Sequence, residues 1–322
     1  MRNENKIDFS VIIPHKNRLR LLRKCVESIP KMEGVEIIIV DDNSDLDNTD
    51  KLNFPGIDEQ NVRVIFSNGG KGAGAARNMG LKIANGKWLI FADSDDFFHE
   101  NISQILKEFK KDNSDIIFFK LEGENLLTGE PDTSRTSGLN TFIDNALKNN
   151  DFDILRYQHG YPVGKMIKRS LVMENNIQFQ EVPNGNDLFF SMLTGHAAKN
   201  FKAVDKTIYV VTSRKEHSLD KEKIQSYINL FNIGIQKIDF LKKINKERLG
   251  YPLVFAFWRK ILHIDLKEGL RKYIILIKAC GFPNTVSSTR RFVLFYFLGQ
   301  LKKLSPDFWI LMKKTRSTIK RY

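Results

Sequence analysis

The chain has 322 residues, of which 42% are hydrophobic. This is enough for one large domain with an appendage or for two modest domains, and it excludes global disorder. The two cysteines, Cys25 and Cys280, are too few for a disulfide framework and suit a reducing compartment. The net charge of +13 is confined to residues 246–322, which hold 17 Lys and Arg against 4 Asp and Glu.

Strand and helix patterns alternate through the first 121 residues. Short apolar runs rich in β-branched residues predict buried strands at Phe9–Pro14, Val35–Ser44, Val62–Asn68, Lys87–Asp96 and Ser114–Leu121. Helical spacing of apolar residues predicts helices at Arg18–Ile29, after the glycines of residues 69–74, and at Asn101–Lys111. This order predicts an α/β layer with a largely parallel sheet.

The rest of the chain divides into a mixed part and a helical part. We expect a polar loop excursion from Glu122 to about Phe152 and a long strand or strand pair over residues 203–214. From Ser218 onward the pattern is helical, in segments 224–244, 253–280 and 290–316. The sequence therefore predicts two domains, residues 1–217 and 218–322.

Polar residues gather where the predicted strands end. Asp41 and Asp42 follow the second strand, and Asp93, Asp95 and Asp96 follow the fourth. In parallel sheets, ligands bind beyond the carboxyl ends of the strands. Adjacent unpaired carboxylates repel one another, and the D-x-D spacing suits Mg²⁺ or Mn²⁺, which takes one or two carboxylates and completes its shell with substrate phosphates. The alternatives are a solvated turn or helix capping.

The stretch GGKGAGAARN fits neither of two common phosphate-binding motifs. A P-loop requires Gly, four residues and then Gly-Lys-Ser/Thr, whereas Gly70-Lys71 is followed by Gly72. A dinucleotide fingerprint requires a third glycine where this chain has Arg77. Two interpretations are left, a glycine-rich helix entry that faces an anion together with Arg77, or a plain tight turn.

The motifs SVIIPHKN, VEIIIVDDNS, GAGAARNMGLKIANGKWLIFADSDD and NDLFF occur in this order. Together they resemble the family 2 glycosyltransferases, which are inverting nucleotide-sugar enzymes of the GT-A fold, most strongly over residues 8–120 and recognisably to about 215. The resemblance implies a Rossmann-like, mostly parallel GT-A catalytic domain at 1–217 with an α-helical C-terminal region. It also implies a β-linked product and a setting in bacterial capsule, lipopolysaccharide or cell-wall glycan synthesis.

On the donor side, the resemblance implies a nucleotide site at the ends of the first strands. Pro14 and the loop to Asn17 would line the base and ribose. Asp42 would contact the base, commonly the uracil of a UDP-sugar, with support from Asp41. Arg77 would lie near the base and the phosphates.

At the reaction centre, the resemblance assigns Asp95 as a ligand of Mn²⁺ or Mg²⁺ and Asp93 as a contact of the ribose or the metal shell. Asp187, in NDLFF, matches the catalytic base that activates a hydroxyl of a glycan or lipid-linked acceptor. Read from the residues alone, Asp187 instead caps the helix that follows it. Asn186 departs from the family pattern, which commonly has Glu there.

The basic tail mixes aromatic residues with Lys and Arg, as in FWRK and RRFVLFYF. Such faces are typical of helices that lie on an anionic membrane surface, which would be the cytoplasmic face, where lipid-linked glycan acceptors are found. We expect no signal peptide, because the N-terminus has no apolar core, and no transmembrane helix. The alternatives are a helical subdomain that packs on the catalytic domain or forms a homodimer. The sequence supports two other interpretations less well, a non-catalytic sugar-nucleotide-binding subunit and a nucleic-acid-binding protein. We expect no nucleic-acid partner.

Overall fold

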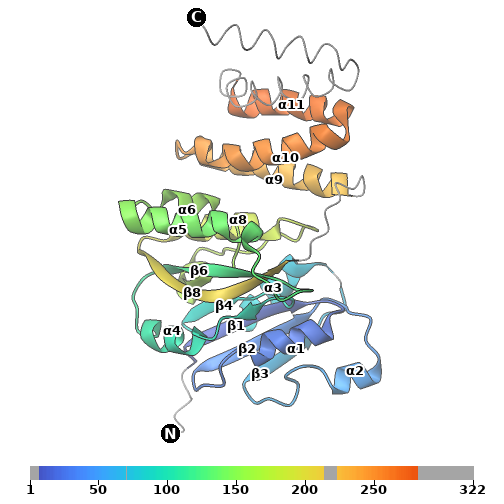
Figure 1. The fold of residues 1–322 in the computed structure, drawn as a ribbon, viewed down its shortest axis with the longest axis vertical. Coiled ribbons are helices and arrows are strands. Elements are labelled where there is room, and N and C mark those ends of the chain that lie inside the picture. The colour runs from blue at the N-terminus through green and yellow to red at the C-terminus, as the bar shows by residue number, and fades with distance from the viewer. Residues whose placement is uncertain (1–6, 70, 214–222, 282–322) are drawn as a thin grey trace, which may run out of the picture. The chain divides into compact units, whose positions relative to one another are not determined.

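The computed structural model describes residues 7–69, 71–213 and 223–281 (Figure 1). The chain divides into two compact units, residues 1–218 and 219–322. Within the described residues, the first unit contains an eight-stranded sheet with the order β3-β2-β1-β4-β7-β6-β8-β5. The strands are β1 Phe9–His15, β2 Val35–Asp41, β3 Val62–Phe66, β4 Trp88–Phe91, β5 Phe97–Phe98, β6 Ile116–Asn125, β7 Lys165–Lys168 and β8 Phe201–Ser213.

The four strands that begin the sheet run parallel and end at one edge. β1 pairs in parallel with β2 and β4, and β2 pairs in parallel with β3, whereas β7 runs antiparallel to β4 and β6. The register places His15 opposite Asp41 at the ends of β1 and β2. The polar residues that follow β1, β2 and β4 therefore share the carboxyl edge of the sheet, as the sequence predicts.

Alternation along the strands builds a core on each face of the sheet. In β1, Val11 and Ile13 belong to one hydrophobic cluster and Ile12 to the other. The helices α1 (Leu19–Glu27) and α4 (Ile102–Phe109) supply the first cluster, and α3 (Ala73–Ile83) and α8 (Asn186–Ala197) supply the second (Figure 1). The other short helices of this unit are α2 Asn48–Leu52, η1 Thr133–Arg135, α6 Asp153–Gln158 and α7 Arg169–Glu174.

The prediction of a loop excursion over residues 122–152 is wrong. β6 continues to Asn125, and α5 (Ser137–Asn149) forms a helix of 13 residues. Its buried residues, Leu139, Ile143 and Ala146, follow the i, i+4, i+7 spacing of one helix face. Three apolar positions are enough to pack a helix against the core when its other face is solvated. The largely polar composition of this segment therefore led to the loop prediction.

The second unit is helical, as the sequence predicts. It contains α9 (Ile224–Lys242), η3 (Glu247–Gly250), α10 (Tyr251–Ile264) and α11 (Leu266–Cys280), which pack around Phe231, Ile238 and Trp258. The predicted segment 253–280 is divided at Asp265, whose backbone is extended and whose side chain accepts a hydrogen bond from Glu268 N (2.9 Å). Segment 290–316 lies outside the described residues. None of the described helices is both long and apolar enough to cross a membrane.

Candidate active site

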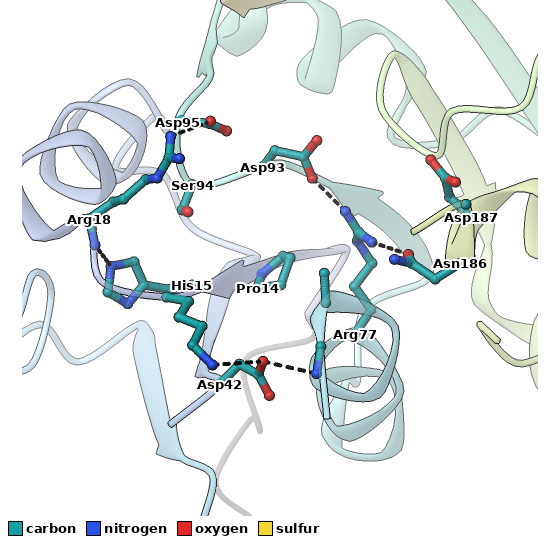
Figure 2. Close-up of a pocket in the computed structure, with 14 residues that line it drawn as sticks. Pro14, His15, Arg18, Asp42, Arg77, Asp93, Ser94, Asp95, Asn186 and Asp187 are labelled. Atoms are coloured by element: carbon teal, nitrogen blue, oxygen red, sulfur yellow. Dashed lines mark hydrogen bonds and ion pairs between the residues drawn. The ribbon is translucent and has the colours of Figure 1, made fainter. Parts of the chain in front are cut away.

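A cavity of about 400 Å³ lies beyond the carboxyl ends of β1, β2 and β4 and is closed on one side by the start of α8 (Figure 2). It is lined by Pro14, His15, Lys16, Arg18, Asp42, Gly72, Ala73, Arg77, Asp93, Ser94, Asp95, Gly185, Asn186 and Asp187. Of the predicted site residues, Pro14, Asp42, Arg77, Asp93, Asp95 and Asp187 therefore meet in one cavity. Asn17 and Asp41 are not among its lining.

Asp41 acts behind the cavity wall through His15. Nδ1 of His15 lies 2.8 Å from Oδ1 of Asp41, and Nε2 accepts a hydrogen bond from the backbone N–H of Arg18 (3.0 Å). Since Nε2 is an acceptor, the proton is on Nδ1 and is donated to Asp41. Burial alone raises the pKa of Asp41, but the hydrogen bonds from His15 and Ser44 outweigh it and hold that pKa below its ordinary value. Asp41 thus fixes the ring that lines the cavity.

Asn17 joins the two loops that follow β1 and β2. Its backbone N–H donates to Oγ of Ser44 (2.8 Å), and its side-chain oxygen accepts from the backbone N–H of Asp45 (2.8 Å). Asn17 has a φ of 55°, in the left-handed region that asparagine tolerates better than most residues. Its side chain is thus used in loop geometry, and it supports the wall formed by its neighbours.

Asp42 is held at the start of α3. Its Oδ2 accepts the backbone N–H of Gly72 (2.9 Å) and lies 3.9 Å from Nζ of Lys16 (Figure 2). Gly72 has a φ of 89°, which favours glycine. A Cβ on Gly74 would lie 2.2 Å from the carbonyl oxygen of Gln180, so glycine is required for this close approach. The glycine-rich stretch is therefore a helix entry that packs closely on the segment before α8.

Arg77 connects the two sides of the cavity. Its guanidinium donates to Oδ1 of Asp93 (2.5 Å) and to Oδ1 of Asn186 (2.7 Å), and its side chain is only 6% exposed (Figure 2). Its Nε has no hydrogen-bond partner in the described part of the chain. These contacts tie the turn after β4 to the first turn of α8. Arg77 was expected near the phosphates, and in this structure its hydrogen bonds go to protein groups.

The aspartates after β4 have three different partners. Asp93 is bound by Arg77, and Oδ2 of Asp95 lies 3.1 Å from NH1 of Arg18. Asp96 points inward, where its Oδ1 accepts the backbone N–H of Thr212 (2.7 Å). Burial, and then the charge of Asp93, raise the pKa of Asp96 to about 8, which favours the neutral form of this carboxyl. The cluster is tolerated because its members are paired or neutral.

The donor set fits a metal ion that is shared with a substrate. In the ranges that the structure describes, no group of three or more His, Cys, Asp or Glu side chains is placed to hold a metal ion. Asp95 nevertheless presents a partly exposed carboxylate to the cavity, and its partner Arg18 is itself partly exposed. One or two carboxylates are what Mg²⁺ or Mn²⁺ uses when phosphates and water supply the other ligands.

Asp187 does not cap α8. The capping position is Gly185, with a φ of 69° and no side-chain cap bond, and Asp187 lies within the first turn. Figure 2 shows the carboxylates of Asp187 and Asp93 on either side of the Arg77 guanidinium, and the two residues come from different elements. Burial raises the pKa of Asp187; the charge of Arg77 lowers it in part and that of Asp93 raises it further. A half-buried carboxylate with a raised pKa suits proton abstraction.

The side chains of two cavity residues, Lys16 and Arg18, were not among the predicted site residues. Both line the cavity and face carboxylates. They follow directly after β1, before α1 begins. Their position at the carboxyl end of a central strand was the signal that could have identified them.

The sheet order and the acidic cavity at its carboxyl edge define a GT-A type of glycosyltransferase fold. Solved structures share it: TarS of Staphylococcus aureus, residues 1–349 in complex with UDP-GlcNAc, has a TM-score of 0.58 at 21% identity, over 88% of this chain and 92% of that one. The glycosyl transferase family 2 profile matches residues 10–174. The chain belongs to this family, and the predictions of family and fold class are confirmed.

Curated relatives extend the likeness beyond the profile. The poly(ribitol-phosphate) beta-glucosyltransferase of Bacillus spizizenii is 33% identical over 64% of this chain and 32% of its own length. The poly(ribitol-phosphate) beta-N-acetylglucosaminyltransferase TarP of S. aureus is 30% identical over 65% of this chain and 64% of its own length. The chain thus spans from about a third to under two thirds of the length of these relatives.

Proposed function

We propose that this protein is a metal-dependent inverting glycosyltransferase, which moves a hexose or N-acetylhexosamine from a UDP-sugar to a hydroxyl group and forms a β-linkage. One observation carries the proposal: a single cavity collects Asp42, Asp95 and Asp187 from three separate segments of the chain. These are the groups needed to bind a nucleotide, to hold a diphosphate through a cation and to accept a proton.

In the proposed reaction, a carboxylate oxygen of Asp187 takes the proton from the acceptor hydroxyl. The acceptor oxygen bonds to the anomeric carbon as the bond from that carbon to the diphosphate breaks, and the electron pair leaves with UDP. Attack from the face opposite the leaving group inverts the anomeric centre. Asp95, with Asp93 nearby, would hold a Mn²⁺ or Mg²⁺ ion, which would offset the negative charge that develops on the diphosphate, and Lys16 and Arg18 line the same cavity as further positive charge.

The relatives narrow the substrate class. Two of them are named as poly(ribitol-phosphate) glycosyltransferases, and TarS has been solved with UDP and with UDP-GlcNAc. We therefore propose that the acceptor is a phosphodiester-linked polyol chain of the bacterial cell wall rather than a capsule or lipopolysaccharide glycan. This proposal places the active site in the cytoplasm, where nucleotide sugars are made.

The first experiment measures UDP release from a panel of UDP-sugars, with and without Mn²⁺. We expect metal-dependent release from one donor and its loss, by about a hundredfold, in Asp95→Ala, because the cation would lose its protein ligand. Asp58→Ala, which removes an exposed carboxylate outside the cavity, is the matched control. Release that is independent of metal in the wild type would contradict metal dependence. UDP binding without release, with or without a ribitol phosphate acceptor, would favour a non-catalytic sugar-nucleotide-binding subunit.

We also propose that the C-terminal unit associates with an anionic membrane surface. On α11, Leu266, Leu270 and Ile274 recur every four residues and are 50%, 53% and 58% exposed. The exposed cations Lys267, Arg271 and Lys278 lie on the same helix. An apolar stripe beside basic residues suits the interface of a bilayer that contains anionic lipid.

This proposal predicts that the binding of the chain to lipid vesicles depends on the charge of the lipid and on the exposed apolar residues of α11. The full chain is expected to sediment with phosphatidylserine vesicles but poorly with phosphatidylcholine vesicles. The double variant Leu270→Asp/Ile274→Asp is expected to bind phosphatidylserine vesicles at least about tenfold more weakly than the wild type, because two apolar side chains no longer enter the bilayer interface. Leu127→Asp, at an 81% exposed position of the first unit, is the control. If the double variant binds vesicles normally but changes the oligomeric state, the face is a homodimer interface.

A further inference from the structure

An ion pair between Arg18 and Asp95 lies at the active-site cavity. NH1 of Arg18 is 3.1 Å from Oδ2 of Asp95, and both side chains line the cavity, one from the loop after β1 and the other from the turn after β4 (Figure 2). The side chain of Arg18 is 43% exposed and that of Asp95 is 41% exposed. Exposed ion pairs of this kind are weak and change an equilibrium constant by about fivefold or less. A stronger ligand can therefore displace either partner.

The backbone of Arg18 is fixed, whereas its guanidinium is held by one group. The backbone N–H donates to Nε2 of His15 (3.0 Å), directly before α1 begins. Within the described ranges, the guanidinium forms no hydrogen bond other than that to Asp95, which leaves most of its five N–H donors for another ligand. Arg77 differs, because it is buried and donates to two protein groups. Arg18 is thus an arginine of this cavity whose side chain can change partners.

A divalent cation at Asp95 would compete with Arg18 for the same carboxylate. The proposed function uses Asp95 to hold Mn²⁺ or Mg²⁺, and a guanidinium bound to that carboxylate repels a cation that approaches it. The nucleotide diphosphate brings negative charge into the same cavity, whose volume of about 400 Å³ is within the usual range for small-molecule sites. A guanidinium can bind phosphate oxygens through two parallel hydrogen bonds. The diphosphate therefore suits Arg18 as a second partner.

We propose that Arg18 exchanges partners during donor binding: it pairs with Asp95 before the cation binds and with the diphosphate of the UDP-sugar afterwards. This inference rests on the proposed function and deepens it, because it gives Arg18 a binding role at the leaving group. The exchange couples the two ligands. Arg18 opposes a cation that binds alone and supports the nucleotide once the cation is in place, so each ligand binds better in the presence of the other.

The test measures two affinities of the full chain. The affinity for Mn²⁺ alone is obtained from the free Mn²⁺ signal in electron paramagnetic resonance, and that for UDP at saturating Mn²⁺ from calorimetry. Arg18→Gln is expected to bind Mn²⁺ alone about threefold to tenfold more tightly, because a competing and repelling charge is gone. The same variant is expected to bind UDP about tenfold more weakly, because a charge-assisted hydrogen bond to the diphosphate is lost. A residue with only a structural role would not move the two affinities in opposite directions.

Arg20→Gln is the matched control, because it removes the same charge from an exposed position of α1 outside the cavity, and both affinities are expected to stay within about twofold of the wild type. Arg18→Lys keeps a charge but not the planar fork, and it is expected to tighten Mn²⁺ binding less than Arg18→Gln does. Failure of the wild type to bind UDP with Mn²⁺ present would count against the proposed function itself. If the wild type binds UDP, an Arg18→Gln variant whose Mn²⁺ affinity does not rise, or whose UDP affinity does not fall, would overturn the partner exchange alone.

Discussion

Replacing Asp187 with asparagine is expected to lower the rate of sugar transfer by about a hundredfold to ten-thousandfold, the range that a positioned general base contributes. An asparagine side chain has nearly the same shape as that of Asp187 but cannot accept the proton of the acceptor hydroxyl. Asp187 does not cap α8, so the substitution removes no cap and the fold is expected to persist. The measurement is kcat for transfer from the UDP-sugar, together with the thermal unfolding midpoint.

A matched variant and the pH dependence separate this role from a structural one. Glu181→Gln, which replaces an exposed carboxylate outside the cavity on the segment before α8, is expected to leave kcat unchanged. The transfer rate of the wild type is expected to rise with pH through an acidic limb above the ordinary range of aspartate, because burial raises the pKa of Asp187 and only its deprotonated form accepts a proton. An Asp187→Asn variant with normal kcat would show that Asp187 is not the base.

Removing the Arg77 guanidinium is expected to affect both stability and rate. Arg77→Ala leaves the Asp93 carboxylate without its cation and Asn186 without its donor. Breaking a buried ion pair costs several kcal/mol, and since the Asp93 carboxylate is about one third exposed, we expect a loss of about 2 kcal/mol in the free energy of unfolding. The transfer rate is expected to fall by more than tenfold because the turn after β4 is no longer tied to α8.

Arg77→Lys tests positioning more sharply. A lysine keeps the charge but cannot span Asp93 and Asn186 with a planar fork. We expect near-normal stability, a reduced kcat and little change in the KM for the donor. In Arg77→Ala the acidic limb of the pH–rate profile is expected to move upward, because the charge of Arg77 lowers the pKa of Asp187.

Arg63→Ala is the control for Arg77, since Arg63 also pairs with a mostly buried carboxylate, Glu36, but does not line the cavity. It is expected to lower stability without a change in the transfer rate of each folded molecule. A pH–rate profile that shifts equally in both arginine variants would contradict a specific role for Arg77.

The sequence by itself determined the order of strands and helices through residue 121, apart from the short α2 and β5, and the edge of the sheet at which the candidate site lies. Apolar runs such as those of β1 and β2 are too continuous to be anything but buried strands, and parallel pairing brings their polar ends together. The motifs around Asp42 and Asp95, which lie within the matched residues 10–174, were also sufficient to indicate the family. These features depend on local pattern, which a single sequence carries.

Only the tertiary structure decided which side chains face the cavity and which support it. Asp41 and Asp42 are neighbours in sequence, yet the pleat turns Asp41 toward His15 and Asp42 toward the cavity. Arg77 contacts Asn186, which lies 109 positions away in the chain, and Arg18 contacts Asp95, which lies 77 positions away. Such contacts depend on the packing of distant elements, so their partners cannot be determined from local spacing.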